Sequence, residues 1–377
     1  MPTQPAPSKT ALILAGGGIM GAAYEIGCLT ALDRLFARGY SCCRFDLFVG
    51  VSAGSVIAAL VANGIPPLRL FKDILHDTPS PFNFRRADIY RVDSRQVLAS
   101  CWRLTTNLWR IFRFYRQRQW QSSRSDLLHI LQEQFPAGLF SLEPMQRYLC
   151  DAFARAGLAD RFDDLSRELY IPAYDLDLGE RVVFGSEGER ELHLCQAITA
   201  SCAIPYFFRP PRIGRRSFVD GSTGHIAHLD IAIERGAELI VVVNPRTPLA
   251  NDQEAICLPS LSYGRCSSIA ELGISFAWEQ SQRIANKEKL SQALASCRRN
   301  HPEVDILLLE PGPEEALMFI QSPMSGAARR DIMSYGYNLT LGQLQARFAD
   351  YQQIFARHGL PLSRERLARA PAVESLA

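Results

Sequence analysis

The chain has 377 residues, of which 47% are hydrophobic and 21% are charged, and these are ordinary values for a globular protein with a sizeable core. Its formal net charge of +2 argues against a general nucleic-acid-binding protein, because such proteins carry a strongly basic surface. The ten cysteines form no C-x-x-C pair, and no histidine pair completes a zinc-binding spacing, so we expect no metal. We expect reduced core thiols in a cytosolic protein.

The first 50 residues predict one βαβ unit. Residues 1–10 are polar and Pro-rich, and we expect a flexible tail there. Residues 11–15 are apolar and predict a strand; the run is too short for a secretory core and has no cleavage pattern. The segment GGGIMG follows at 16–21, and residues 22–38 have helical spacing. A second short strand is predicted at 46–49, parallel to the first with a right-handed crossover.

The motif on which the interpretation depends is G-x-S-x-G at residues 50–54, with Ser52 at its centre. A buried strand precedes it, and an apolar helix at 56–62 follows, ended by Asn63 and Gly64. This is the layout of a nucleophile elbow. Gly50 and Gly54 remove side chains that would collide with the backbone in so sharp a turn.

Two other interpretations of this stretch are available. The motif occurs by chance in glycine-rich chains. Residues 47–65 are also 19 residues without a charge, almost enough to span a bilayer. Their six glycine, serine and asparagine residues disfavour a membrane helix, and no basic cluster precedes them.

The glycine segment and the elbow should lie together, because parallel strands deliver their following turns to the same edge of a sheet. The segment also satisfies G-x-G-x-x-G, and nucleotide binding is therefore an alternative hypothesis. A dinucleotide fold would need an acidic residue at the end of the second strand, where Val49 and Gly50 stand. We favour a loop of free N–H groups beside Ser52, suited to an oxyanion.

Residues 66–144 differ in character, and we predict a helical cap or insertion over about 76–145. Within it, residues 102–120 begin and end with tryptophan and carry five arginines and no acid. At helical spacing, Leu104, Leu108, Ile111 and Tyr115 form an apolar stripe beside Phe112, with Arg103, Arg110 and Arg113 opposite. A basic amphipathic helix of this kind suits peripheral contact with a lipid interface; a helix docked on the core is an equal alternative.

The remaining elements follow from the same periodicities. Strands are predicted at 168–175 and 180–184, which form a hairpin, and at 212–219, 238–244 and 304–309. Helices are predicted at 194–201, 231–235, 269–294 and 329–355, and a loop at 250–268. We expect residues 11–245 to be the catalytic domain, 246–360 to complete the sheet and its covering helices, and 361–377 to be a tail.

Ser52 needs a base, and Asp220 is the sharpest candidate. It ends an apolar strand, where a carboxylate is out of place unless it is paired or working. Gly221 behind it allows close backbone approach. A turn-capping aspartate is the structural alternative. His225 and His228 follow closely, so a Ser-Asp-His order is a second alternative.

Together these residues resemble the patatin-like phospholipases over about residues 10–245. The motifs that carry the resemblance are GGGIMG at 16–21, GVSAG at 50–54, ASCAIP at 200–205, DGS at 220–222, and Asp175. The resemblance implies a three-layer α/β/α sandwich with a mostly parallel central sheet, and a Ser-Asp dyad without histidine. Met20 stands where the family usually has arginine or lysine, and Ser222 where it usually has glycine or alanine.

By that resemblance, Ser52 is the nucleophile, Asp220 is the base, and the amides of Gly17 and Gly18 hold the oxyanion. Gly16, Gly21 and Ala53 are expected to shape the same oxyanion and substrate site, while Gly221 and Ser222 support Asp220. We therefore expect a cytoplasmic serine lipid acyl hydrolase of phospholipase A or esterase type, without cofactor or metal. A peripheral location at membranes is the alternative. The alternative is a non-catalytic lipid-binding or scaffold protein on the same fold.

Overall fold

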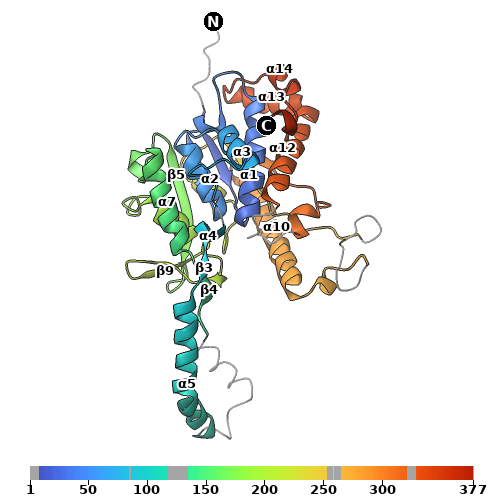
Figure 1. The fold of residues 1–377 in the computed structure, drawn as a ribbon. Coiled ribbons are helices and arrows are strands. Elements are labelled where there is room, and N and C mark those ends of the chain that lie inside the picture. The colour runs from blue at the N-terminus through green and yellow to red at the C-terminus, as the bar shows by residue number, and fades with distance from the viewer. Residues whose placement is uncertain are drawn as a thin grey trace.

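The computed structural model describes residues 8–84, 86–117, 135–252, 258, 265–320 and 328–376. Residues 1–7, most of the predicted N-terminal tail, lie outside this range. The chain opens with the predicted βαβ unit (Figure 1): β1 (Thr10–Leu14), α1 (Gly18–Leu35) and β2 (Leu47–Gly50), followed by α2 (Ala53–Ala62). β1 and β2 pair in parallel. The uncharged stretch at 47–65 is therefore a strand, a turn and a helix.

The other elements are listed here in chain order. The further strands are β3 (Arg91–Val92), β4 (Gly138–Ser141), β5 (Glu168–Asp175), β6 (Glu180–Phe184), β7 (Tyr206–Phe208), β8 (Arg212–Ile213), β9 (Arg216–Val219), β10 (Leu239–Val243) and β11 (Asp305–Leu309). The further helices are α3 (Pro67–Leu75), α4 (Arg86–Ile89), α5 (Ser94–Gln117), α7 (Glu143–Ala156), α8 (Leu194–Ser201), α9 (Leu229–Glu234), α10 (Ile274–Asn300), α11 (Leu317–Ile320), α12 (Arg329–Ala346), α13 (Phe348–Arg357) and α14 (Arg364–Ala368).

Within the described residues the central sheet has eight strands, in the order β11-β10-β1-β2-β5-β9-β8, with β6 paired to β5. The four pairings from β11 through β5 are parallel. The pairings of β5 with β6 and with β9, and of β8 with β9, are antiparallel. The prediction of a mostly parallel sheet is confirmed, as is the β5–β6 hairpin.

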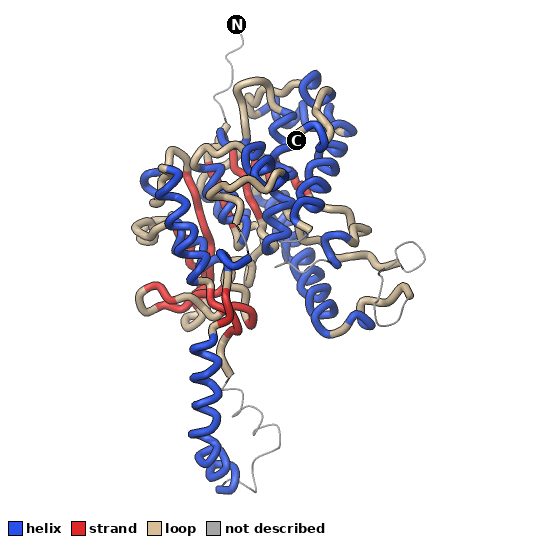
Figure 2. Tube along the Cα trace, in the orientation of Figure 1, coloured by secondary structure: helices blue, strands red, loops and turns tan. Residues whose placement is uncertain are grey.

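Helices cover both faces of this sheet, because alternate strand residues point to opposite sides. Leu12, Leu14 and Phe48 join the core that packs under α1, α2 and α12. Ala11, Ile13 and Val49 join a second core with side chains of α9 and α10. The result is the expected α/β/α arrangement, and Figure 2 shows the strands running between the helices.

Three predicted elements differ in detail. The strand expected at 212–219 is the β8–β9 hairpin, which turns at Gly214 in the left-handed conformation (φ 61°). The helix expected at 329–355 is divided into α12 and α13 at Arg347. Residues 361–377, expected as a tail, contain α14, and Leu367, Val373 and Leu376 are buried. Most of the loop expected at 250–268 lies outside the described residues.

The predicted insertion contains α5, a helix that projects away from the sheet and its layers (Figure 1). Residues 118–120 of the basic segment lie outside the described range, as do the side chains of Ile111, Phe112 and Tyr115. Leu104 is half-buried and Leu108 is exposed, so the apolar stripe expected to include both is not covered by the core. None of the described helices is both long enough and apolar enough to cross a bilayer.

The expectation that all cysteines are reduced was wrong. Cys150 of α7 and Cys195 of α8 form a disulfide, and Cys266 is disulfide-bonded as well. The two bonded helices pack against each other, but their cysteines are 45 residues apart in the sequence. A local cysteine spacing therefore could not predict the bond. Disulfides are rare in cytosolic proteins, so these bonds do not support the expected cytoplasmic location, which stays a prediction.

Candidate active site

The elbow holds Ser52 in a strained backbone conformation. Its φ of 52° and ψ of −130° lie where residues other than glycine are rare, and such strain gathers at functional sites. The flanking glycines are required by space: a Cβ on Gly50 would lie 2.5 Å from the Ser55 Cα, and one on Gly54 would lie 2.5 Å from the Leu14 carbonyl oxygen. The turn therefore fixes the hydroxyl of Ser52 above the edge of the sheet.

The hydroxyl of Ser52 donates a hydrogen bond of 2.7 Å to Oδ2 of Asp220. Asp220 follows β9, and both side chains are buried. The other carboxylate oxygen, Oδ1, accepts from the backbone N–H of Ser222 at 2.8 Å and from its hydroxyl at 2.7 Å. The structure thus brings together two residues 168 positions apart that the sequence had paired as nucleophile and base.

Burial raises the pKa of the Asp220 carboxyl, and the hydrogen bonds from Ser52 and Ser222 oppose that rise. An aspartate at its ordinary pKa is a poor base near neutral pH. A raised pKa makes the carboxylate a better proton acceptor for the Ser52 hydroxyl.

Three backbone amides beside Ser52 remain open. Within the described residues, the N–H groups of Gly17, Gly18 and Ala53 have no hydrogen-bond acceptor. Gly17 and Gly18 have φ of 133° and 69°, a conformation that glycine tolerates and that turns the loop before α1. Unpaired amides at two helix N-termini form a place for developing negative charge.

The N–H groups of Gly16 and Gly21 are already paired, unlike those of Gly17 and Gly18. The Gly16 N–H donates to Oε1 of Glu25 at 2.9 Å, and the Gly21 N–H to the Gly17 carbonyl at 3.1 Å. A Cβ on Gly16 would lie 2.3 Å from the Val51 carbonyl oxygen. Gly16 thus packs closely against the elbow, whereas a Cβ on Gly21 would lie 2.7 Å from the Gly16 carbonyl oxygen, within the glycine loop itself.

Glu25 and Ser201 support the site and were missed from the sequence. Glu25 is fully buried, its Oε2 has no partner among the described residues, and burial raises its pKa to about 8. Ser201 accepts from the Ser52 N–H at 2.9 Å and donates to the Pro172 carbonyl at 2.7 Å. An acid on the apolar face of α1 was the available signal for Glu25; Ser201 lies within the 200–205 motif.

The histidine alternative finds no support in the geometry. His228 hydrogen-bonds the Gly221 carbonyl oxygen at 2.9 Å, and burial lowers its pKa to about 4. The ring of His225 lies 5.5 Å from that of His228. Among the described residues, neither imidazole hydrogen-bonds Ser52 or Asp220, and no group of three or more His, Cys, Asp or Glu side chains is placed to hold a metal ion.

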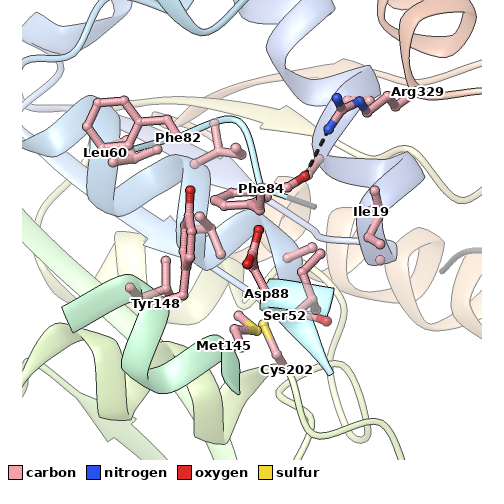
Figure 3. A pocket seen from close by; sticks show the side chains of 18 of the residues that line it. Ile19, Ser52, Leu60, Phe82, Phe84, Asp88, Met145, Tyr148, Cys202 and Arg329 are labelled. Carbon is pink, nitrogen blue, oxygen red and sulfur yellow. Dashed lines mark hydrogen bonds between the residues drawn. The ribbon is translucent and has the colours of Figure 1, made fainter. Parts of the chain in front are cut away.

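An apolar cavity of about 310 Å³ opens onto Ser52. It follows one side of α2, where Ser52, Val56 and Leu60 are four residues apart, and helices α1, α3 and α7 supply most of the facing wall. Figure 3 shows Ser52 and Cys202 close together, with Phe82, Met145 and Tyr148 among the other lining side chains. Asp88 and Arg329 are the charged residues of this lining among the described residues.

Comparison with known proteins places this site within a family match. Residues 12–232 match the family described as patatin-like phospholipase. The uncharacterized protein YqhO of Bacillus subtilis (strain 168) is 26% identical over 220 residues, which cover 55% of this chain and 62% of that protein. The probable lipid hydrolase 463L of Invertebrate iridescent virus 6 is 21% identical over 230 residues, covering 59% and 63% respectively. The match thus spans less than two thirds of either relative.

Among solved structures, VipD from Legionella pneumophila is similar with a TM-score of 0.37 and 14% identity, covering 91% of this chain and 67% of that one. The family match extends over more than half of the chain and contains Ser52, Asp220 and the glycine loop. The chain belongs to the patatin-like phospholipase family.

Proposed function

We propose that this protein is a serine lipid acyl hydrolase of phospholipase A or esterase type, with Ser52 as nucleophile and Asp220 as general base. The observation that carries the proposal is the 2.7 Å hydrogen bond from the Ser52 hydroxyl to the buried Asp220 carboxylate. The unpaired amides of Gly17, Gly18 and Ala53 and the apolar cavity support it. The name of the viral relative, a probable lipid hydrolase, points to the same class.

The chemistry runs in two halves. The Ser52 oxygen attacks the ester carbonyl carbon while its proton passes to Asp220, and the open amides bind the resulting oxyanion. Asp220 then protonates the leaving alcohol, and an acyl-enzyme remains on Ser52. Water attacks that ester, Asp220 takes the water proton, and the fatty acid leaves as Ser52 regains its hydrogen. Each open amide is worth about 10²–10³ in rate where such donors have been removed.

The cavity favours a substrate with an aliphatic acyl chain. Its lining is mainly leucine, isoleucine, valine and phenylalanine, and it begins at the nucleophile. An acyl chain that enters it leaves water and places its carbonyl carbon at Ser52, which is the orientation that hydrolysis requires. A polar head group has no comparable set of partners inside the cavity.

The test is labelling with a fluorophosphonate, followed by a panel of acyl esters and phospholipid vesicles. We expect wild type to be labelled at Ser52, and Ser52→Ala and Asp220→Asn to lose at least about 10³-fold in fatty-acid release. Asp177→Asn, an exposed carboxylate on the β5–β6 turn, is the matched control. Failure to label folded wild type would favour the non-catalytic lipid-binding alternative. Binding of NAD or ATP near millimolar concentrations would favour the nucleotide hypothesis.

The substrate class implies contact with a lipid surface, and α5 is the element suited to it. Leu98, Trp102 and Trp109 are spaced four and seven residues apart, so they share one side of the helix, and each is more than 60% exposed. The 24 residues of α5 include five arginines and no acid. Exposed tryptophan beside arginine is typical of helices that lie in the interface of anionic membranes.

The elements before and after α5 in the chain connect its exposed surface to the cavity. Ile89 of α4, which precedes α5 in the chain, lines the cavity, and so do Met145 and Tyr148 of α7, which follow it. A membrane bound through α5 would therefore contact an element that is joined in the chain to residues of the cavity lining. The alternative interpretation of this segment, a helix docked on the core, does not account for the exposed tryptophans.

Vesicle flotation tests the membrane contact. For Arg110→Gln with Arg113→Gln we expect about thirtyfold weaker binding to vesicles that contain phosphatidylglycerol, since each arginine near an anionic surface is worth about 1 kcal/mol. Arg298→Gln with Arg299→Gln, exposed at the end of α10, is the matched control. Equal flotation of both double variants would count against α5 as the contact.

A further inference from the structure

Arg246 lies against the glycine loop from an element outside the sequence motifs. The chain leaves β10 at Asn244, and the Arg246 N–H donates to the Asn244 Oδ1 at 3.2 Å. A Cβ on Gly17 would lie 3.1 Å from both the Arg246 Cγ and the Pro245 Cγ. The stem of Arg246 therefore packs directly on the loop whose amides are open toward Ser52.

The guanidinium of Arg246 belongs to a cluster that retains a positive charge. Its Nη2 donates to both oxygens of Glu279 at 3.0 Å, and Glu279 also accepts from Nε of Arg283 at 2.8 Å. Two cations thus share one carboxylate, and the three side chains are 22%, 18% and 4% exposed in the order Arg246, Glu279, Arg283. Charge in such a shielded place acts over longer distances than charge in water.

Part of the Arg246 donor capacity is unused. Its Nε is buried and has no hydrogen-bond partner among the described residues. Arg283, in contrast, also donates to the carbonyl oxygens of Thr247 and Met318. Arg246 is thus the member of the cluster that combines contact with the glycine loop and an unsatisfied buried donor.

The positive charge of Arg246 affects the pKa of Asp220 in the Ser52–Asp220 pair. It lowers the pKa of Asp220 slightly, against the dominant effect of burial. The other groups that face Asp220 are the hydroxyls of Ser52 and Ser222 and the thiol of Cys202, whose pKa burial raises. Met20, which carries no charge, is buried in the core. Arg246 is therefore the cation near this site for which the structure gives both a contact with the loop and an effect on Asp220.

We propose that Arg246 is a positioning residue for acyl hydrolysis, which supports Gly17 with its stem and favours negative charge at the oxyanion site with its guanidinium. The inference rests on the proposed function. During attack, negative charge leaves the Asp220 carboxylate as it takes the proton and appears on the substrate oxygen. A cation whose stem packs on the glycine loop favours that transfer of charge.

The experiment measures the rate of Ser52 labelling by a fluorophosphonate as a function of pH. In this reaction the serine oxygen attacks phosphorus, fluoride leaves, and the serine proton passes to Asp220. Arg246→Met keeps the stem and removes the charge, and Arg246→Lys keeps a charge. Glu279→Gln removes the counter-charge instead. Thermal unfolding of each variant separates loss of folding from loss of reactivity.

For Arg246→Met we expect labelling above the acid limb to fall about tenfold, because the cation no longer favours negative charge on the phosphoryl oxygen. The acid limb should move to higher pH by well under about one unit, because Arg246 is the smallest of the named effects on the pKa of Asp220. Arg246→Lys should stay within about threefold of wild type, and Glu279→Gln should move the limb to lower pH. Profiles of all three that coincide with wild type would overturn the role of Arg246. Absence of labelling in wild type would instead overturn the proposed function, and this inference with it.

Discussion

The catalytic edge and helix α5 are built on opposite principles. At the edge, Gly16, Gly50 and Gly54 are required because a side chain would strike backbone, and the reactive groups are buried. In α5 the large side chains of Trp102 and Trp109 stand in solvent, far from any core. The catalytic edge depends on glycines, which have no side chain, whereas α5 depends on large exposed side chains. Substitutions should therefore act on chemistry in the first region and on surface binding in the second.

The largest effect is expected at Glu25, the buried acid beneath the edge. Its pKa is about 8 in the folded protein and near 4.5 when unfolded, so the folded state holds a proton that the unfolded state has lost between those pH values. Stability should fall as pH rises from about 4.5 to 8, by up to about 5 kcal/mol in total. Glu25→Gln should keep the Gly16 hydrogen bond and lose this dependence.

Denaturant titrations of wild type and Glu25→Gln at several pH values check this. The two free energies of unfolding should diverge as pH rises, with the variant relatively more stable above pH 8. Parallel curves would mean that Glu25 is ionised in the folded protein, and that the edge tolerates a charge beside its open amides.

At the elbow itself, Gly54→Ala should cost about 10²-fold in ester hydrolysis. The added Cβ would meet the Leu14 carbonyl at 2.5 Å and Glu25 Oε1 at 3.0 Å, so the elbow must shift, and displacements of about 1 Å have such an effect on rate. Gly64→Ala is a control in a glycine with open space around it, although its φ of 80° adds strain. Hydrolysis of a short soluble ester measures both, and vesicle flotation should not change.

The reverse pattern is expected in α5. Trp102→Ala with Trp109→Ala should weaken vesicle binding about tenfold, because two exposed rings would no longer enter the interface. Hydrolysis of a soluble ester should be unaffected, since neither ring lines the cavity. Ile284→Ala, an exposed side chain on α10, is the control. A soluble-ester rate that falls with the tryptophans would show that the two regions are coupled.

The smallest effect is expected from Ser222→Ala. The lost hydroxyl donates to Asp220 Oδ1, and that hydrogen bond favours the carboxylate form. Its removal should raise the pKa of Asp220 further and move the acid limb of the rate profile to higher pH by less than about one unit. The backbone N–H of Ser222 continues to donate, so the rate above the limb should change little.

The elements around the site could be predicted because their signals are local. The apolar strands, the glycine runs and the alternation in 168–184 specify β1, α1, β2 and the β5–β6 hairpin without reference to the rest of the chain. Ser52 and Asp220 came from the same kind of signal, at the ends of strands. The rule that parallel strands end at one edge does not explain their approach, because β9 pairs with β5 in the antiparallel direction. The pairing of Ser52 with Asp220 was expected from the resemblance to the patatin-like phospholipases.

The supporting residues could not be predicted because their partners are distant. Ser201 is 149 positions from Ser52, and Arg246 contacts Gly17 from the segment that follows β10. Nothing in the neighbouring residues of Cys150 indicates a bond to Cys195. α12 and α13 are divided at Arg347, and no glycine or proline stands at that position or in the four residues on either side of it to indicate the break. These features depend on the completed fold.

The close contact between α1 and α12 has a consequence for the unit of folding. A Cβ on Gly27 would lie 2.2 Å from the Met333 carbonyl oxygen, and one on Gly336 would lie 2.6 Å from that of Tyr24, so the two helices interlock without intervening side chains. α12, β10 and β11 all lie beyond residue 232, where the family match stops, yet β10 is a direct neighbour of β1. A fragment cut at the family boundary would lose β10 and β11, two of the five parallel strands, together with the helix against which α1 packs, and would therefore not be an autonomous catalyst.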